Sequence, residues 1–276
     1  MSPEEKPPIR PFLKWAGGKF RLLPKIKALL PAGNRLIEPF VGAGAVFLNT
    51  HYKHYLLSDC NSDLVNLYRI LQKKGDNFID QAERYFKPAN NQAEVFYEQR
   101  VRFNEIKRNT AEKAALFLYL NRHGYNGLCR YNSKHEFNVP FGLYRKPYFP
   151  AKEMQAFYHK AQSAEFICSD YLPIMNNACE GDIVYCDPPY APLSDSAHFT
   201  RYSGDAFTFL DQQRLAETAE KLAEKNIPVL LSNHDTEAMR KLYHKSEQTH
   251  FNVARLISQK TQQRLAVGEI LALYSS

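Results

Sequence analysis

The stretch RLIEPFVGAG, residues 35–44, decides the fold of this chain. Its apolar first half predicts a short strand, and Gly42 and Gly44 lie where that strand turns into a helix. Glycine suits such a turn because the backbone bends tightly there and a ligand can come close. A second strand is predicted over residues 55–59, and it ends on Asp59. Strand, glycine turn, helix and strand make a βαβ unit, so the chain begins as an α/β domain.

The composition is that of an ordinary soluble globular protein. Of 276 residues, 44% are hydrophobic and 24% charged, and the length suits one large domain or one domain with an insertion. The apolar runs are too short to span a membrane, and residues 1–11 lack the apolar stretch of a signal peptide. The five cysteines include no Cys-x-x-Cys pair, which argues against a zinc site and a disulfide framework. We therefore expect a cytoplasmic protein that binds neither membrane nor metal and is a monomer in solution.

The α/β pattern returns late in the chain after a long helical interruption. Apolar residues at three- and four-residue spacing predict helices within residues 64–120. Thr208 and Asp211 form a capping-box pair that starts a helix running to Lys225. Strands are predicted over residues 165–168, 183–187, 227–233, 251–257 and 270–274, the last two as an antiparallel pair. These elements predict one α/β domain interrupted by a mostly helical insertion.

The segment from 119 to 148 combines basic and aromatic residues. It holds five Lys or Arg against one acid, together with seven aromatic residues. The net charge of the whole chain is +7, which mildly favours a polyanionic partner. Basic and aromatic residues interleaved in this way are typical of a nucleic-acid-binding surface. The glycines and prolines within the segment, Asn126-Gly127 among them, predict hairpin turns.

Asp-Pro-Pro-Tyr, residues 187–190, follows the apolar run 183–186 and predicts a rigid acidic loop at the end of a strand. Two prolines fix φ twice and remove two backbone donors, so the loop offers only acceptors beside an aromatic ring. A planar ligand with an amino group, such as a nucleobase, fits this arrangement. Four residues alone are a weak filter, because the same sequence could be a simple turn.

An adenosine-containing cofactor is indicated by the first βαβ unit. Asp59 follows Glu38 by about 20 residues, where an acid can accept both ribose hydroxyls. A dinucleotide normally requires a third glycine, and this chain has Phe47 there. Glu38 would also repel a pyrophosphate, whereas it suits the cationic S-adenosylmethionine. Lys19 follows two glycines but is followed by Phe20 rather than Ser or Thr, so a phosphate loop is not indicated.

Four separated motifs, in one order, resemble the α-group, D12 class DNA adenine-N6 methyltransferases. They are FLKWAGGK (12–19), EPFVGAG (38–44), Asp59 and DPPY (187–190). Residues 120–132, LNRHGYNGLCRYN, further resemble the DNA-reading hairpin of the Dam-type, GATC-specific members. The resemblance runs from Phe12 to about residue 235 and extends to Leu271–Tyr274 near the end.

The resemblance implies a Rossmann-like, seven-stranded, mostly parallel sheet with an inserted, mainly helical target-recognition domain. On this chain, residues 1–62 and 150–276 would form the cofactor-binding catalytic domain. Residues 63–149 would form the target-recognition domain, with a hairpin over about 120–145.

The implied activity is transfer of a methyl group from S-adenosylmethionine to N6 of adenine in double-stranded DNA, at GATC sites, after the base flips out of the duplex. The expected catalytic residues are Asp187, Pro188 and Tyr190. The expected cofactor-binding residues are Trp15, Lys19, Glu38, Phe40, Gly42, Gly44, Asp59 and Asp187. The expected DNA-binding residues are Lys14, Tyr125, Asn126, Leu128, Arg130, Pro140 and Tyr144.

Two places depart from the family pattern. Leu143 stands where close relatives often carry a basic residue, and residues 258–266 lack their Gly-Gly and Lys-rich stretch. Both changes remove positive charge near DNA, so they bear on affinity and processivity more than on chemistry. Other interpretations stay open: the same chemistry on cytosine N4, RNA adenine or a protein glutamine amide; a non-catalytic DNA-binding regulator; and a nicotinamide dehydrogenase. A solitary role in repair and replication and a partnership with a restriction enzyme are equally compatible with the sequence.

Overall fold

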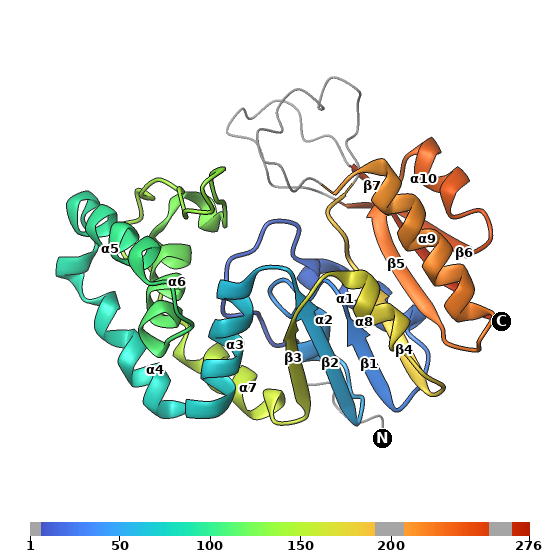
Figure 1. Cartoon of the computed structure of the whole chain (residues 1–276), viewed down its shortest axis with the longest axis horizontal. Coiled ribbons are helices and arrows are strands. Elements are labelled where there is room, and N and C mark those ends of the chain that lie inside the picture. The colour runs from blue at the N-terminus through green and yellow to red at the C-terminus, as the bar shows by residue number, and fades with distance from the viewer. Residues whose placement is uncertain (1–6, 191–206, 254–266) are drawn as a thin grey trace. The chain divides into compact units, whose positions relative to one another are not determined.

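The computed structural model describes residues 7–190, 207–253 and 267–276, and it confirms the α/β class. Seven strands form one mixed, mostly parallel sheet in the order β3-β2-β1-β4-β5-β7-β6 (Figure 1). The strands are β1 (Arg35–Glu38), β2 (His54–Asp59), β3 (Ala164–Cys168), β4 (Asp182–Cys186), β5 (Val229–His234), β6 (Glu247–Val253) and β7 (Val267–Tyr274). Each strand predicted from the sequence is present, although the ends differ by a few residues.

The strand order reverses between β1 and β4. β1 leads along the chain to β2 and β3 on one side, whereas β4 and β5 extend the sheet on the other. β1 and β4 pair in parallel, with Ile37 opposite Val184. In open α/β sheets, ligands bind beyond the carboxyl ends of the strands at such a reversal. Glu38 is the last residue of β1 and Asp187 follows the last residue of β4, so both acids stand at this edge.

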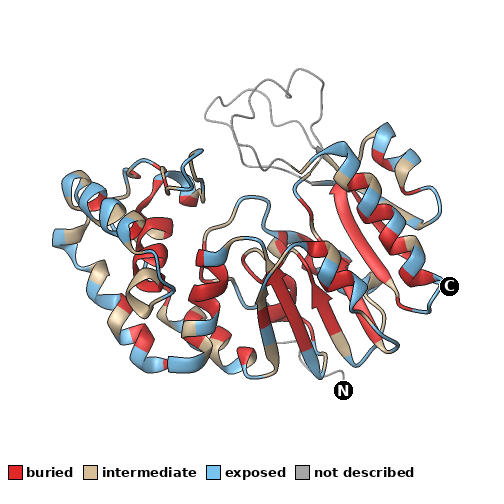
Figure 2. Cartoon of the chain, in the orientation of Figure 1, coloured by how far each residue is buried: buried red, intermediate tan, exposed pale blue. Residues whose placement is uncertain are grey.

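Strands β4 and β5 are buried along their whole length (Figure 2). Burial on both faces is expected of central parallel strands, and it explains their continuous apolar runs. β7 pairs antiparallel with β5 and with β6, which confirms the predicted closing pair. β6 begins at Glu247, earlier than expected, and the predicted strand residues 254–257 lie outside the described part of the chain.

The chain divides into two compact units. Unit 1 comprises residues 1–24, 41–51 and 57–168, and unit 2 comprises residues 25–40, 52–56 and 169–276. The α-helices that lie in unit 1 are α2 (Ala45–Asn49), α3 (Ser62–Lys74), α4 (Asp76–Glu83), α5 (Ala93–Glu105), α6 (Ala111–His123) and α7 (Ala151–Ala161). The remaining α-helices are α1 (Leu23–Leu29), α8 (Tyr171–Asn176), α9 (Phe209–Ala223) and α10 (Glu237–Leu242). The 3₁₀ turns are Lys19–Leu22, Arg84–Phe86, Pro88–Asn90 and Tyr125–Gly127.

The long helices follow from their sequences. The Thr208 hydroxyl accepts from the Asp211 N–H, and the Asp211 side chain accepts from the Thr208 N–H, so the predicted capping box starts α9. In unit 1, the core is aromatic: the Phe157 ring lies 4.7 Å from that of Tyr68 and 5.1 Å from that of Phe12. Among the described residues, every helix is too short or too polar for a transmembrane span.

Candidate active site and nucleic-acid interface

The predicted acidic loop lies directly after β4, in unit 2, and β5 positions its carboxylate. Cys186 is paired with Leu231, which brings the next residues of the two strands, Asp187 and Ser232, side by side. The Ser232 hydroxyl donates to Asp187 Oδ1 at 3.1 Å, and it also lies 3.2 Å from the Tyr185 hydroxyl. Ser232 is fully buried, so the orientation of the Asp187 carboxylate is set from inside the sheet.

Tyr190 is fixed at the other end of the same loop. Its hydroxyl donates to Glu269 Oε2 of β7 at 2.6 Å, and its ring packs edge-on against His234 at 4.6 Å. Burial, and next the charges of Asp187 and Glu269, raise the pKa of Tyr190 well above its usual value. The hydroxyl therefore stays protonated and keeps donating to Glu269.

The middle of the loop is also held. Pro188 is buried, and the Pro189 carbonyl accepts from Gln212 Nε2 of α9 at 2.9 Å. The loop is therefore anchored by Gln212, Ser232 and Glu269, three residues that the sequence did not single out. A usable signal was present for Ser232 alone, because a polar residue near the end of a buried strand needs a hydrogen-bond partner.

Two further predicted residues of unit 2 stand beside β4. Glu38 is 2% exposed at the end of β1. Phe40 stacks on Tyr171 with ring centres 5.3 Å apart and meets the edge of Phe207 at 5.7 Å. The acid Glu38 and the aromatic ring of Phe40 thus lie at the carboxyl end of β1, the strand next to β4.

In unit 1, the glycine turn lies beside Asp59. Gly42 and Gly44 have φ of 46° and 71°, a region that side chains rarely adopt. The Gly42 N–H donates to Asp59 Oδ2 at 3.1 Å, and Asp59 Oδ1 accepts from the Asn61 N–H at 2.9 Å. Burial raises the pKa of Asp59, and these two N–H groups oppose that rise.

Trp15 lies against the same turn. A Cβ atom at Gly42 would lie 2.9 Å from Trp15 Nε1, so only glycine lets the indole come this close. Lys19 is 6% exposed, and its ammonium donates to the Gly17 carbonyl at 2.7 Å. Trp15, Gly42 and Asp59 therefore form one cluster in unit 1, while Lys19 points at the backbone of its own loop.

The hairpin turn predicted at Asn126-Gly127 is wrong. These residues end a 3₁₀ turn after α6, and Asn126 has φ of 52°. The Tyr125 N–H donates to the Pro140 carbonyl at 2.9 Å, so residues 140–142 pair with this turn instead of forming a second one. Tyr125 and Asn126 are exposed, and Leu128 is half-buried.

Within the predicted hairpin, the innermost pairing spans residues 130–138, and an outer antiparallel bridge joins Gly124 to Phe141. Tyr131 pairs with Phe137, and the Asn138 N–H donates to the Arg130 carbonyl at 3.0 Å. Arg130 is exposed, and its Nε donates to Asn138 Oδ1 at 2.8 Å. The guanidinium is therefore held in place from one side and stays accessible on the other.

Lys14 lies against the 3₁₀ turn, although it is far away in the sequence. Its backbone exchanges two hydrogen bonds with the Asn121 amide, at 3.0 and 2.8 Å. Its ammonium lies 3.6 Å from the ring centre of Tyr144. Partial burial, and next the charge of Arg122, lower the pKa of Lys14 to about 8.

Of the two departures from the family pattern, Leu143 lies in the described part of the chain and residues 258–266 do not. Leu143 is 95% exposed beside Tyr144, so its apolar side chain faces solvent. Residues 258–266 lie outside the described ranges. Within those ranges, no three His, Cys, Asp or Glu side chains are grouped to hold a metal ion.

Comparison with known proteins gives one consistent result. The chain is 52% identical over 265 residues to a DNA adenine methylase of Escherichia coli (strain K12), covering 96% of this chain and 95% of that protein. Related methylases of Serratia marcescens and Vibrio cholerae are 51% and 49% identical and also cover 96% of this chain, and 98% and 96% of their own lengths. A precorrin 8W decarboxylase structure from Methanobacterium thermoautotrophicum covers 93% of this chain and 90% of its own at 10% identity, with a TM-score of 0.38.

The family model described as "D12 class N6 adenine-specific DNA methyltransferase" matches residues 15–262. That range includes the glycine turn, Asp59, the hairpin and the acidic loop. The chain therefore belongs to the D12 class N6 adenine-specific DNA methyltransferases, which use S-adenosylmethionine as the methyl donor.

Proposed function

We propose that this enzyme methylates adenine N6 in GATC sites of double-stranded DNA, and that Asp187, Pro188 and Tyr190 hold the flipped base. The observation that supports the proposal is the anchored loop. The Ser232 hydroxyl donates to Asp187 Oδ1 at 3.1 Å, and the Tyr190 hydroxyl donates to Glu269 Oε2 at 2.6 Å, which fixes the Tyr190 ring. Such prior anchoring supports catalysis because the acceptors need no rearrangement when the base arrives.

The loop would act on an amine that is a poor nucleophile, because its lone pair is delocalised into the adenine ring. The Asp187 carboxylate and the Pro188 carbonyl accept the two N6 hydrogens, which directs the lone pair out of the ring plane. The Tyr190 ring stacks on the base and keeps that orientation. The positive charge that develops on N6 is stabilised by Asp187. S-adenosylmethionine, when bound, supplies the methyl group as an activated sulfonium.

The residues around Gly42 fit an adenosine with a cationic tail. Asp59 offers acceptors for ribose hydroxyls, and the glycine turn lets a ligand approach beside Trp15. Glu38, a buried acid, suits the positive charge of the methionine part. We assign cofactor binding to these residues together with Lys19, Phe40, Gly44 and Asp187.

Residues 63–149 are proposed as the target-recognition domain, with residues 1–62 and 150–276 as the catalytic domain. Tyr125 and Asn126, exposed on a turn, would fill the space that the flipped adenine leaves. Arg130 would read guanine through O6 and N7. Lys14, Leu128, Pro140 and Tyr144 would make the remaining contacts with DNA. We also propose that the protein works in the cytoplasm, as a monomer on DNA.

Restriction digestion tests the target. This gene is expressed in a host that lacks adenine methylation. Plasmid from that host should become resistant to a restriction enzyme that methylated GATC blocks, and sensitive to a restriction enzyme that requires methylated GATC. A third enzyme that cuts GATC regardless of methylation controls for DNA quality. Unchanged digestion, or methylation found on cytosine N4 or on RNA, would contradict the proposal.

Replacing Gly42 by Ala should weaken binding of S-adenosylmethionine about tenfold. The new Cβ would meet Trp15 Nε1 at 2.9 Å, and the left-handed backbone adds about 1–2 kcal/mol of strain. Titration calorimetry measures the dissociation constant. Gly181→Ala is the matched control, because Gly181 has φ of 87° but lies in the loop before β4. Equal cofactor binding by the wild type and Gly42→Ala would contradict the role of this turn.

DNA binding should weaken as the pH rises through 8. Lys14, whose pKa is about 8, is mostly charged at pH 7 and mostly neutral at pH 9, so its attraction for phosphate is lost across that window. Fluorescence anisotropy with a labelled GATC duplex, at constant ionic strength, measures the effect. The Lys14→Met variant should bind weakly with a flatter pH profile, and Lys14→Arg should stay tight at pH 9. Parallel profiles for the wild type and Lys14→Met would exclude Lys14 as the titrating group.

A further inference from the structure

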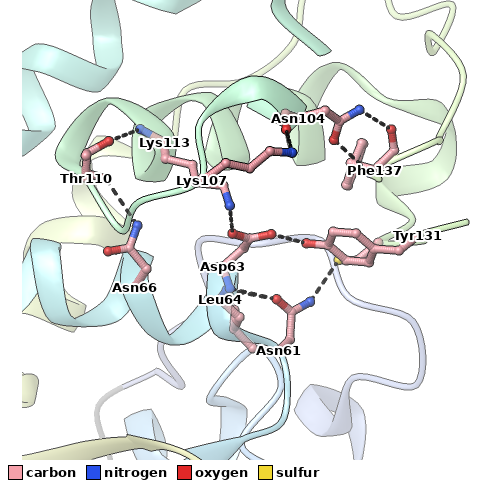
Figure 3. Close-up of polar contacts among 11 residues, drawn as sticks. Asn61, Asp63, Leu64, Asn66, Asn104, Lys107, Thr110, Lys113, Tyr131 and Phe137 are labelled. Atoms are coloured by element: carbon pink, nitrogen blue, oxygen red, sulfur yellow. Dashed lines mark hydrogen bonds and ion pairs between the residues drawn. The ribbon is translucent and has the colours of Figure 1, made fainter. Parts of the chain in front are cut away.

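Asn61 and Asp63, at the start of α3, are hydrogen-bonded to the hairpin that contains Tyr131 (Figure 3). Asn61 caps α3, its Oδ1 accepting from the N–H groups of Asp63 and Leu64 at 3.0 and 3.1 Å. Its Nδ2 donates to Cys129 Sγ at 3.4 Å. One amide therefore serves the start of α3 and the residue next to Arg130.

Asp63 makes the second connection. It is 6% exposed, its Oδ2 accepts from the Tyr131 hydroxyl at 2.8 Å, and its Oδ1 pairs with Lys113 Nζ of α6 at 2.7 Å. Burial raises the pKa of Tyr131, so its hydroxyl remains a donor. A buried carboxylate with two partners keeps both of them in a defined place.

The two connected residues flank Arg130. Side chains of an extended segment alternate between its two faces, so Cys129 and Tyr131 can face α3 while Arg130 faces away. Arg130 is indeed exposed, and Asn138 on the opposite arm of the hairpin holds its guanidinium. Fixing residues 129 and 131 thus fixes the backbone from which the guanidinium projects.

We propose that Tyr131 and Asp63 are positioning residues for sequence recognition, and that their hydrogen bond sets the place of Arg130 against guanine. The inference rests on the proposed role of Arg130 in reading guanine. Neither residue touches DNA in this scheme. They act through Arg130, which distinguishes them from residues that contribute phosphate contacts.

The test compares kcat/KM for a GATC duplex with kcat/KM for duplexes in which the guanine is replaced. Tyr131→Phe should lower this discrimination ratio about fivefold. Tyr119→Phe is the matched control: it also removes a buried hydroxyl of unit 1, one that donates to the Asn90 carbonyl at 2.7 Å, and it should keep the ratio. Thermal unfolding of both variants separates loss of stability from loss of discrimination.

A double-mutant cycle shows whether Tyr131 acts through Arg130. Adding Tyr131→Phe to Arg130→Ala should lower the ratio no further, because the group being positioned is gone. A further loss in that background, or a wild-type ratio in Tyr131→Phe when Arg130→Ala has lost discrimination, would overturn the inference. A wild-type ratio in Arg130→Ala itself would overturn the assigned role of Arg130, and this inference with it.

A second pair of variants keeps the test independent of Tyr131. Asp63→Asn retains an oxygen that can accept from the Tyr131 hydroxyl, whereas Asp63→Ala removes it. The ratio should fall in Asp63→Ala and largely survive in Asp63→Asn. Equal ratios in the two variants would contradict the positioning role.

Discussion

Replacing Asp187 by Ala is expected to reduce methyl transfer by about two to three orders of magnitude while DNA binding survives. In the proposed mechanism, the change removes the acceptor that aligns N6 and the negative charge that stabilises the developing positive charge, and loss of one such group costs about 10²- to 10³-fold in comparable sites. The Ser232 hydroxyl, which donates to Asp187 at 3.1 Å, also loses this acceptor. Transfer of a tritiated methyl group to a GATC duplex measures the rate.

Two further variants separate the effect of the Asp187 charge from an effect of removing any nearby acid. Asp187→Asn keeps an oxygen acceptor without the charge, so it should fall between the wild type and Asp187→Ala. Glu180→Ala, which removes an exposed acid before β4, should behave like the wild type. Near-normal turnover in Asp187→Ala would remove the basis of the proposed mechanism, whatever the other variants show.

Replacing Arg130 by Ala should relax recognition of guanine by roughly 10- to 100-fold. A guanidinium that bonds both O6 and N7 of guanine discriminates by about 1–3 kcal/mol. The effect should appear in the ratio of kcat/KM between GATC and guanine-substituted duplexes. Since Arg130 is exposed and, among the described residues, its guanidinium bonds to Asn138 of the same hairpin, the fold should persist.

Lys134→Ala provides the contrast, because Lys134 is an exposed cation at the tip of the same hairpin. Loss of a positive charge that contacts only phosphate weakens binding to all DNA sequences equally and lowers the salt dependence of binding. The discrimination ratio should therefore stay unchanged in Lys134→Ala. If Arg130→Ala and Lys134→Ala both lose affinity equally for all duplexes, Arg130 contacts the DNA phosphate backbone and not guanine.

The sheet could be predicted because its central strands are buried. β4 and β5 lie between neighbours on both sides, and such strands need unbroken apolar runs. β6, at the edge of the sheet, begins with the polar residues Glu247 and Gln248, so the apolar pattern of the sequence predicts a later start for this strand. The six-residue helices α8 and α10 are too short for a periodic pattern, and only their caps, Asp170 and Thr236, mark them.

The hairpin shows why local rules failed at Asn126-Gly127. That pair does adopt left-handed φ, as a tight turn requires, but the turn closes α6. The reversal of the chain instead occurs near His135, with φ of 57°, where Asn132 Oδ1 accepts from the N–H groups of Lys134 and Glu136. A side chain that mimics a backbone turn leaves a fainter sequence signal than Asn-Gly.

The candidate site could be predicted where its residues are consecutive in the sequence, as at Asp187–Tyr190 and around Gly42. It was not predictable where the contact joins distant segments. Gln212 and Glu269 reach the acidic loop from α9 and β7, and nothing near them in the sequence points to that loop. Hydrogen bonds of this kind depend on how α9 packs and on the register of β7 in the folded sheet.

The bond from Tyr190 to Glu269 has a consequence for biosynthesis. Glu269 belongs to β7, which inserts between β5 and β6, so this strand is added after both of its neighbours have been translated. A nascent chain whose residue 269 is still inside the ribosome tunnel lacks that anchor, and domains fold as units once their chain has emerged. Methylating capacity would therefore arise only after β7 has left the tunnel and joined the sheet.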